Sequence, residues 1–161
     1  MNTSSNMNSS SRDEGQNLLL DDAKNFIPLD TDSVYANNRY GYEIHYPSQW
    51  PAGEESPSGD GVVLYSDDGN DIRVYGGYLL GDPLDNMEID EAKANNWSIE
   101  TIGIAAGDGQ LIQTSVDNQR LFHFIVKGST IQCHLYAMVT EDFYSANYEA
   151  LLEMANSITF D

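Results

Sequence analysis

The chain has 161 residues, enough for one domain with a core of its own, and its 26 Asp and Glu residues against 7 Lys and Arg residues give a formal net charge of −19. A surface of this sign repels phosphate backbones and anionic lipid headgroups, which argues against nucleic acid and simple membrane-surface binding. Because the acids are spread along the chain, solubility explains the charge, and a basic partner or a salt-adapted organism is the alternative.

Residues 1–16 are predicted to be a disordered polar tail, because Asn, Ser and Thr dominate and almost no side chain there can be buried. Polar spacers of this kind follow the lipidated cysteine of bacterial lipoproteins, so the tail is interpreted either as a tether or as an ordinary flexible terminus. It has neither the pattern of a signal peptide nor a cysteine, so a lipid tether is expected only in residues lost from before Met1. Residues 17–39 are expected to form an extended arm or a short helix that ends before Pro28. No run approaches ~20 apolar residues, so no transmembrane segment is expected.

The folded domain is predicted to span residues 40–161. Five strands are predicted before residue 117, at 40–46, 61–66, 71–79, 100–105 and 110–116, and residues alternate between two faces along the first and third of them. The Gly76-Gly77 pair indicates a bulge or a close backbone approach, and residues 107–109 are expected to be a hairpin turn. A helix is predicted from about Asp90 to Asn96.

The most informative stretch is 121–139, where two alternating strands flank a glycine-serine turn at 128–129. In this register Phe124 opposes Cys133, and every inward residue meets an inward residue. The chain has one cysteine, so an intrachain disulfide is excluded, and the inward Cys133 is expected to behave as a small apolar residue.

Thr140 is a favourable N-cap for a final helix. That helix carries an apolar stripe at three- and four-residue spacing, which is expected to pack on the sheet: Tyr144, Tyr148, Leu151, Leu152 and Ala155. Residues 157–160 are expected to add a short edge strand. Hairpins with helices between and after them predict an α+β fold, with a central, mainly antiparallel β-sheet flanked by helices.

Two stretches together resemble a known family. Residues 40–50, Tyr-Gly-Tyr-Glu-Ile-His-Tyr-Pro-Ser-Gln-Trp, resemble the opening strand and Tyr-Pro-Ser-x-Trp motif of PsbP-like domains, and the last hairpin, helix and Ser-Ile-Thr-Phe ending are similar to how those domains end. The resemblance implies an α-β-α sandwich over residues 40–161. The family includes the extrinsic oxygen-evolving subunit of photosystem II, a nuclear-import factor that binds the Ran GTPase and many bacterial extracytoplasmic lipoproteins. It implies an accessory or binding module without a shared set of catalytic residues.

Two sets of side chains are candidates for a binding site. The predicted hairpin places His123 opposite His134, close enough for two imidazoles to share a Zn²⁺ or Cu²⁺ ion, and the alternative is two residues packed beneath a helix. An aromatic patch of Tyr46, Trp50 and Tyr75 is predicted to bind a ligand or a partner protein, and the alternative is that these rings fill the strands.

The remaining motifs point away from catalysis. The Asp-rich turn at 67–71 lacks the oxygen spacing of a calcium loop and is interpreted as a solvated turn. The sequence contains no nucleophile elbow, phosphate loop, zinc-protease motif or dinucleotide fingerprint, so neither an enzyme nor a cofactor is expected. A hydrolase whose site is assembled from scattered residues is the remaining enzymatic alternative. The sequence predicts a non-enzymatic module that contacts another protein outside the cytoplasm, as a cell-surface lipoprotein or a secreted protein. The alternative is a small-ligand or metal-binding protein that uses His123 and His134 or a tyrosine-rich face.

Overall fold

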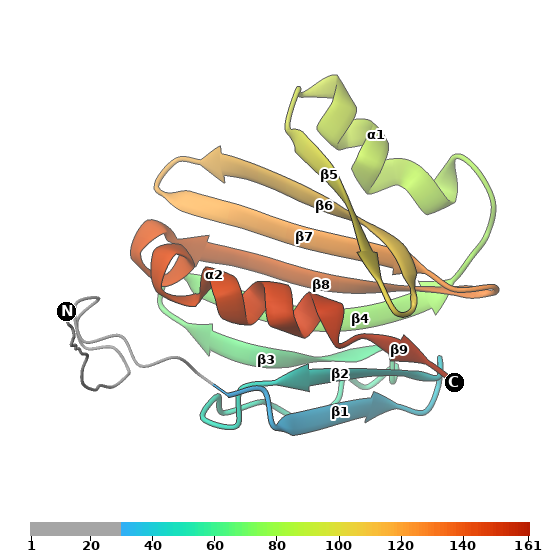
Figure 1. Ribbon diagram of the computed structural model, residues 1–161, viewed down its shortest axis with the longest axis horizontal. Helices are drawn as coiled ribbons and strands as arrows, with labels where there is room; N and C mark the ends of the chain where they lie inside the picture. Colours follow the sequence, from blue (N-terminus) through green and yellow to red (C-terminus); the bar gives the residue numbers. More distant parts are fainter. Residues whose placement is uncertain (1–29) are drawn as a thin grey trace.

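The structure is a computed structural model that describes residues 30–161 (Figure 1). The predicted tail at 1–16 and residues 17–29 of the arm or short helix expected at 17–39 lie outside these described residues. The described part contains two antiparallel sheets and two α-helices, which confirms the predicted α+β fold.

The central sheet has six strands in the order β3-β4-β8-β7-β6-β5. Their bounds are β3 Gly61–Asp67, β4 Asn70–Tyr78, β5 Ser98–Ile104, β6 Gly107–Val116, β7 Gln119–Lys127 and β8 Ile131–Thr140. The second sheet, in the order β1-β2-β9, consists of β1 Ser33–Asn37, β2 Tyr42–Tyr46 and β9 Thr159–Phe160. The helices are α1 Met87–Ala94, which follows the 3₁₀ turn η3 Leu84–Asn86, and α2 Glu141–Asn156.

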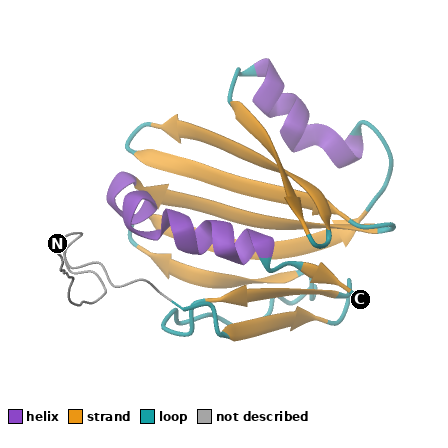
Figure 2. Cartoon of the chain, in the orientation of Figure 1, coloured by secondary structure: helices purple, strands orange, loops and turns teal. Residues whose placement is uncertain are grey.

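The main core lies on the face of the central sheet that α2 crosses (Figure 2). Phe122, Phe124 and Leu135 point into it and are fully buried. Burying a side chain of this size stabilises a fold by about 1.5–3 kcal/mol. Helix α2 begins where the sequence predicts, because the hydroxyl of Thr140 accepts a hydrogen bond of 3.2 Å from the N–H of Phe143.

The β7–β8 hairpin differs from the predicted register. Its turn lies one residue later, at 129–130, since the Gly128 N–H donates to the Ile131 carbonyl over 2.8 Å, and the partner of Phe124 is Leu135 instead of the predicted cysteine. Moving a hairpin turn by one residue shifts the pairing by two, which leaves every side chain on its original face. The phenylalanines therefore point into the main core as predicted, although their partners were wrong.

The predicted turn at 107–109 is also wrong, because these residues begin β6 and the β5–β6 turn lies at 105–106. Glycine at position 109 serves packing: a Cβ there would lie 2.1 Å from Cζ of Phe124. The close approach expected at Gly76 is confirmed as an aromatic contact, since a Cβ on Gly76 would lie 2.7 Å from Cε2 of Tyr42. Both glycines make room for a ring of the main core.

Two element boundaries differ from the sequence prediction. Strand β1 pairs with β2, so the second sheet begins before the predicted domain start at residue 40. Helix α1 begins at Met87 instead of about Asp90, because the 3₁₀ turn η3 runs directly into it without a side-chain cap. Neither helix of the described part is long and apolar enough to span a membrane.

Candidate functional site

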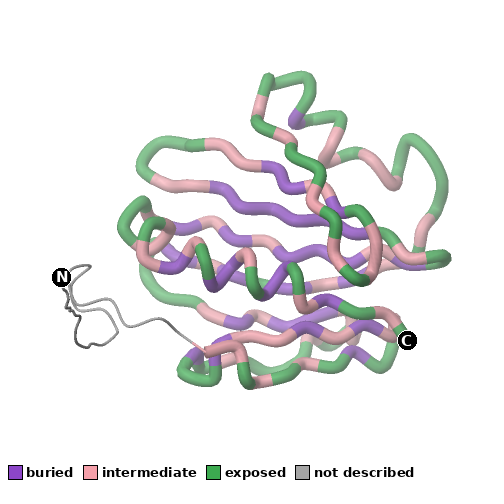
Figure 3. The backbone as a smooth tube through the Cα atoms, viewed as in Figure 1, coloured by how far each residue is buried: buried purple, intermediate pink, exposed green. Residues whose placement is uncertain are grey.

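Helix α1 packs on the second face of the central sheet but covers only part of it. Beneath it, Ala92 packs with a small cluster on β6 and β7 that consists of Ile112, Leu121 and Ile125. Figure 3 shows the consequence in β7, where residues 121–126 are all buried because both faces of the strand are covered. Nearer β3 and β4 the chain forms an open groove with a volume of about 540 Å³.

The groove is bounded by the loop that precedes β3 and by side chains of β3, β4 and β8. Its walls include Glu54, Asp60, Val63, Arg73, Tyr75 and Tyr136. Backbone hydrogen bonds hold the loop along β3, because the Gly53 N–H donates to the Val63 carbonyl over 2.9 Å and the Ser56 N–H donates to the Gly61 carbonyl over 2.8 Å. This wall is therefore fixed by the fold and needs no ligand to form.

His123 and His134 contact two of these wall residues, Tyr136 and Tyr75 respectively. They are not directly opposed, since His123 pairs with Tyr136 and His134 pairs with Ile125. The two histidines are diagonal neighbours on one face of the hairpin, a spacing that ring side chains can bridge. Nε2 of His123 and Nδ1 of His134 lie 2.9 Å apart, so that one ring donates a hydrogen bond to the other. The structure thus brings the predicted pair together in a different register.

Burial keeps both histidines uncharged. Their exposed fractions are 6% for His123 and 4% for His134. Burial lowers the pKa of His123 to about 4. Burial, and in second place the proximity of a charge on His123, lowers the pKa of His134 to about 3. At neutral pH the pair consequently consists of two neutral rings, of which one contributes an N–H and the other a lone pair.

The histidine pair supports the two tyrosines of the groove. The Tyr75 ring stacks on His134 with centroids 4.6 Å apart and planes 12° from parallel. The Tyr136 ring meets His123 edge to face, with centroids 5.4 Å apart and an angle of 83°. Burial, followed by the carboxylate of Glu88 on α1, raises the pKa of Tyr75 to about 12, so its hydroxyl stays protonated at neutral pH.

The charged side chains of the groove have defined partners. Arg73 forms a salt bridge with Asp71, in which Nη2 and Oδ2 lie 2.7 Å apart. The Ser56 hydroxyl donates to Asp60, and this hydrogen bond is the main cause that lowers the pKa of Asp60. Asp60 is therefore ionised at neutral pH. Together with Glu54, these residues give the groove an excess of negative charge.

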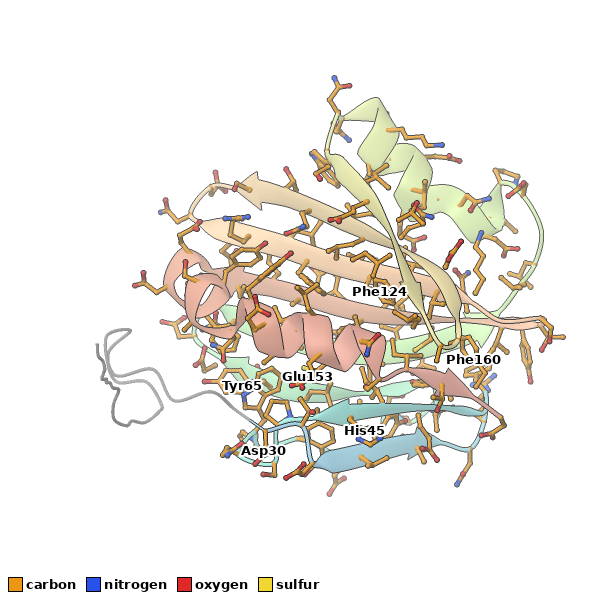
Figure 4. All side chains as sticks on the ribbon, in the orientation of Figure 1. Asp30, His45, Tyr65, Phe124, Glu153 and Phe160 are labelled. Carbon is orange, nitrogen blue, oxygen red and sulfur yellow. The ribbon has the colours of Figure 1, made fainter. Side chains whose placement is uncertain are left out.

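The structure does not bring Tyr46, Trp50 and Tyr75 together. Trp50 is only 7% exposed and belongs to the main core, where its ring packs 5.4 Å from Tyr65 and 6.1 Å from Phe143. Figure 4 labels Tyr65 near the end of α2 that carries Phe143. Tyr46 packs against the same core from β2. Of the three predicted residues, Tyr75 alone lines the groove, on the opposite face of the central sheet.

The Asp-rich turn between β3 and β4 is tied to the fold by its asparagine. The Asn70 amide donates to Oδ1 of Asp67 over 2.8 Å, and its Oδ1 accepts from the Thr140 N–H over 2.9 Å. Within residues 30–161, no group of three or more His, Cys, Asp and Glu side chains is arranged to hold a metal ion.

Sequence reasoning missed Arg73 and the groove role of Tyr136. The pairing of β4 with β8 places Arg73 opposite Tyr136 and Tyr75 opposite His134. Alternation along one strand assigns a face to each residue, but it does not say which distant strand lies alongside. The sequence did indicate that Arg73 and Tyr75 share one face of their strand. That face forms the groove together with Tyr136 because β8 lies beside β4.

Comparison with known proteins bears on the fold. No family model matches the chain, and no curated protein matches its sequence. Among solved structures, the solution structure of cyanobacterial PsbP (CyanoP) from Synechocystis sp. PCC 6803 is similar with a TM-score of 0.57 at 12% sequence identity, over 80% of this chain and 92% of that one. The chain therefore has a PsbP-like fold, as the motifs at its two ends indicated.

Proposed function

We propose that the protein is a non-enzymatic accessory module that binds another protein through the groove beside β3 and β4. The groove itself carries this proposal, because it presents Tyr75 and Tyr136 from two neighbouring strands in a fixed arrangement. Tyrosines are enriched at the energetic centres of protein interfaces, and side chains held on rigid strands lose little conformational freedom on binding.

The surroundings of the histidine pair support a role in positioning and not in catalysis. A general base must come within about 3 Å of the proton that it removes. His123 and His134 are 6% and 4% exposed, and each uses one ring nitrogen in the hydrogen bond to the other. We infer that the pair holds Tyr75 and Tyr136 in place, through the stacked and edge-to-face contacts described above.

We further propose that the module acts outside the cytoplasm, tethered through its N-terminal segment. The proposal follows from the PsbP-like fold together with the family resemblance, since that family includes extrinsic and extracytoplasmic proteins. Fractionation of the source cells tests it, with an antibody against the native chain as the probe. We expect the protein in the envelope or secreted fraction, and a chain found in the cytosol would contradict the tether.

Comparative affinity purification tests the binding groove. The wild-type chain, a Tyr136→Ala/Arg73→Ala variant and a Val116→Ala control are each used as bait in extracts of the source cells. Val116 is 41% exposed on β6, where it is not part of the groove. We expect one protein to be recovered by the wild type and the control but lost from the groove variant. Equal recovery by all three folded baits would contradict binding through the groove.

The second candidate function is metal binding by His123 and His134. Their 2.9 Å contact and their neutral state at pH 7 favour it, because a metal binds neutral imidazole. A bound ion would have to replace the hydrogen bond between the rings and recruit further ligands. Metal binding is tested by titrating the protein with Zn²⁺ and Cu²⁺ and measuring its melting temperature. A metal site requires a rise that disappears in His123→Ala, whereas equal behaviour of the two proteins excludes it.

A further inference from the structure

We propose that the groove receives a cationic side chain, a lysine or arginine of the partner protein, against the Tyr75 ring and between the carboxylates of Glu54, Asp60 and Glu88. This inference rests on the proposed function and assigns a chemistry to its ligand. It begins with the position of Tyr75. One side of its ring is covered by His134, while the side chain also lines the groove.

An aromatic ring fixed in this way is suited to a cation. The electron-rich face of a tyrosine attracts ammonium and guanidinium groups within about 6 Å of the ring centre. The imidazole stacked on Tyr75 is neutral, so the support itself adds no positive charge that would oppose such a ligand. The chain already contains this kind of contact elsewhere, since the guanidinium of Arg120 lies 3.9 Å from the centre of the Tyr144 ring.

The carboxylates near Tyr75 come from two parts of the chain, the loop that precedes β3 and helix α1. Asp60 directly precedes Gly61, which pairs with Tyr75 across the β3–β4 ladder. Glu54 lies on the loop held along β3, and Glu88 of α1 is close enough to contribute to the raised pKa of Tyr75. A cation beside the ring would therefore meet negative charge from the loop that bounds the groove and from Glu88 of the neighbouring helix α1.

The arginine of the groove leaves this negative charge in place. Arg73 is held by Asp71 through two contacts, Nη2 to Oδ2 at 2.7 Å and Nε to Oδ1 at 3.2 Å. The charge of Arg73 still acts on Tyr75, and that of Arg39 acts on Asp60. The carboxylates of Glu54, Asp60, Asp71 and Glu88 nevertheless outnumber these two guanidinium groups. The net charge of −19 on the whole chain acts in the same direction and attracts a basic partner over longer distances.

The test uses capped pentapeptides with one central residue, either arginine, lysine or the uncharged citrulline, titrated into the full chain and followed by NMR. We expect the arginine and lysine peptides to shift the signals of Tyr75 and its groove neighbours, with the citrulline peptide at least about 10-fold weaker. Added salt should weaken the binding of the two charged peptides. Equal binding of arginine and citrulline peptides, or no binding by either charged peptide, would overturn the inference.

Two variants with the same change of charge separate a site from general attraction. Glu54→Gln/Glu88→Gln removes one carboxylate of the groove wall and one whose charge acts on Tyr75, whereas Glu100→Gln/Glu149→Gln removes exposed carboxylates on β5 and α2. We expect the first variant to bind the arginine peptide about 3- to 30-fold more weakly and the second less than about 2-fold. Equal weakening in both variants would mean that only net charge acts, and the proposed groove would not be a cation site.

A ring variant supplies the remaining check. Tyr75→Leu keeps an apolar side chain beside His134 and removes the aromatic face. It should lower the affinity for the arginine peptide about 3- to 10-fold. An unchanged affinity in this variant would overturn the role given to the Tyr75 ring. A different outcome is that none of the peptides binds, although the wild-type bait still recovers a partner that the Tyr136→Ala/Arg73→Ala bait does not. That outcome would refute the cationic ligand and leave the proposed function standing.

Discussion

Acid is predicted to destabilise the protein through His123 and His134. Burial holds the pKa of these rings at about 4 and about 3 in the folded protein, whereas an unfolded chain titrates histidine near about 6.5. Between those values the unfolded chain binds protons that the folded protein does not. The contribution of the pair to stability is therefore complete above about pH 6.5 and is lost as the pH falls toward the folded values.

The size of this loss follows from the burial of the pair. At pH 5, about 1.5 units below the unfolded pKa, each buried neutral histidine costs about 2 kcal/mol relative to pH 8, at about 1.36 kcal/mol per unit. The two together cost about 4 kcal/mol, a large share of the roughly 5–15 kcal/mol by which domains are stable. Urea unfolding of the wild type and of His123→Gln/His134→Gln at both pH values isolates the effect, because the carboxylates titrate in both proteins. The wild type should lose about 4 kcal/mol more than the variant, and equal losses would refute the buried neutral pair.

Two further substitutions test the packing that positions the site. Gly109→Ala should cost about 1–3 kcal/mol of unfolding free energy, because its Cβ would lie 2.1 Å from Cζ of Phe124, and an added Phe124→Leu should recover part of that loss. Gly77→Ala is the matched control, since nothing lies within 4 Å of its Cβ, and similar losses at both glycines would contradict the predicted contact. Thr140→Ala should cost about 1 kcal/mol through loss of the N-cap of α2, measured by thermal or urea unfolding, whereas Thr140→Ser should retain most of it.

The strands and the faces of their side chains were more predictable than the register in which the strands pair. Alternation along 121–139 assigned the correct face to Phe124 and to both histidines, because a strand repeats every two residues. The turn was misplaced by one residue, since either position keeps all side chains on the same faces. Gly109 shows a different failure: glycine there indicates a turn by local propensity, while the structure uses it to admit the ring of Phe124.

The candidate site was only partly visible in the sequence. His123, His134 and Tyr75 were singled out, and the structure places them in one cluster. Trp50 was grouped with Tyr75 for its residue type alone, and it lies in the main core on the other face of the sheet. The groove depends on β8 lying beside β4, a contact between segments about sixty residues apart, which no local pattern encodes.

Photo-crosslinking in the source cells tests the binding groove most directly. A benzoylphenylalanine is placed at Tyr136, where it replaces one aromatic side chain by another, and at Glu149, which is exposed on α2 across the central sheet. Binding through the groove predicts a discrete adduct with one other protein from position 136 and none from position 149. Adducts from position 149 alone, or from neither position in the folded protein, would contradict it.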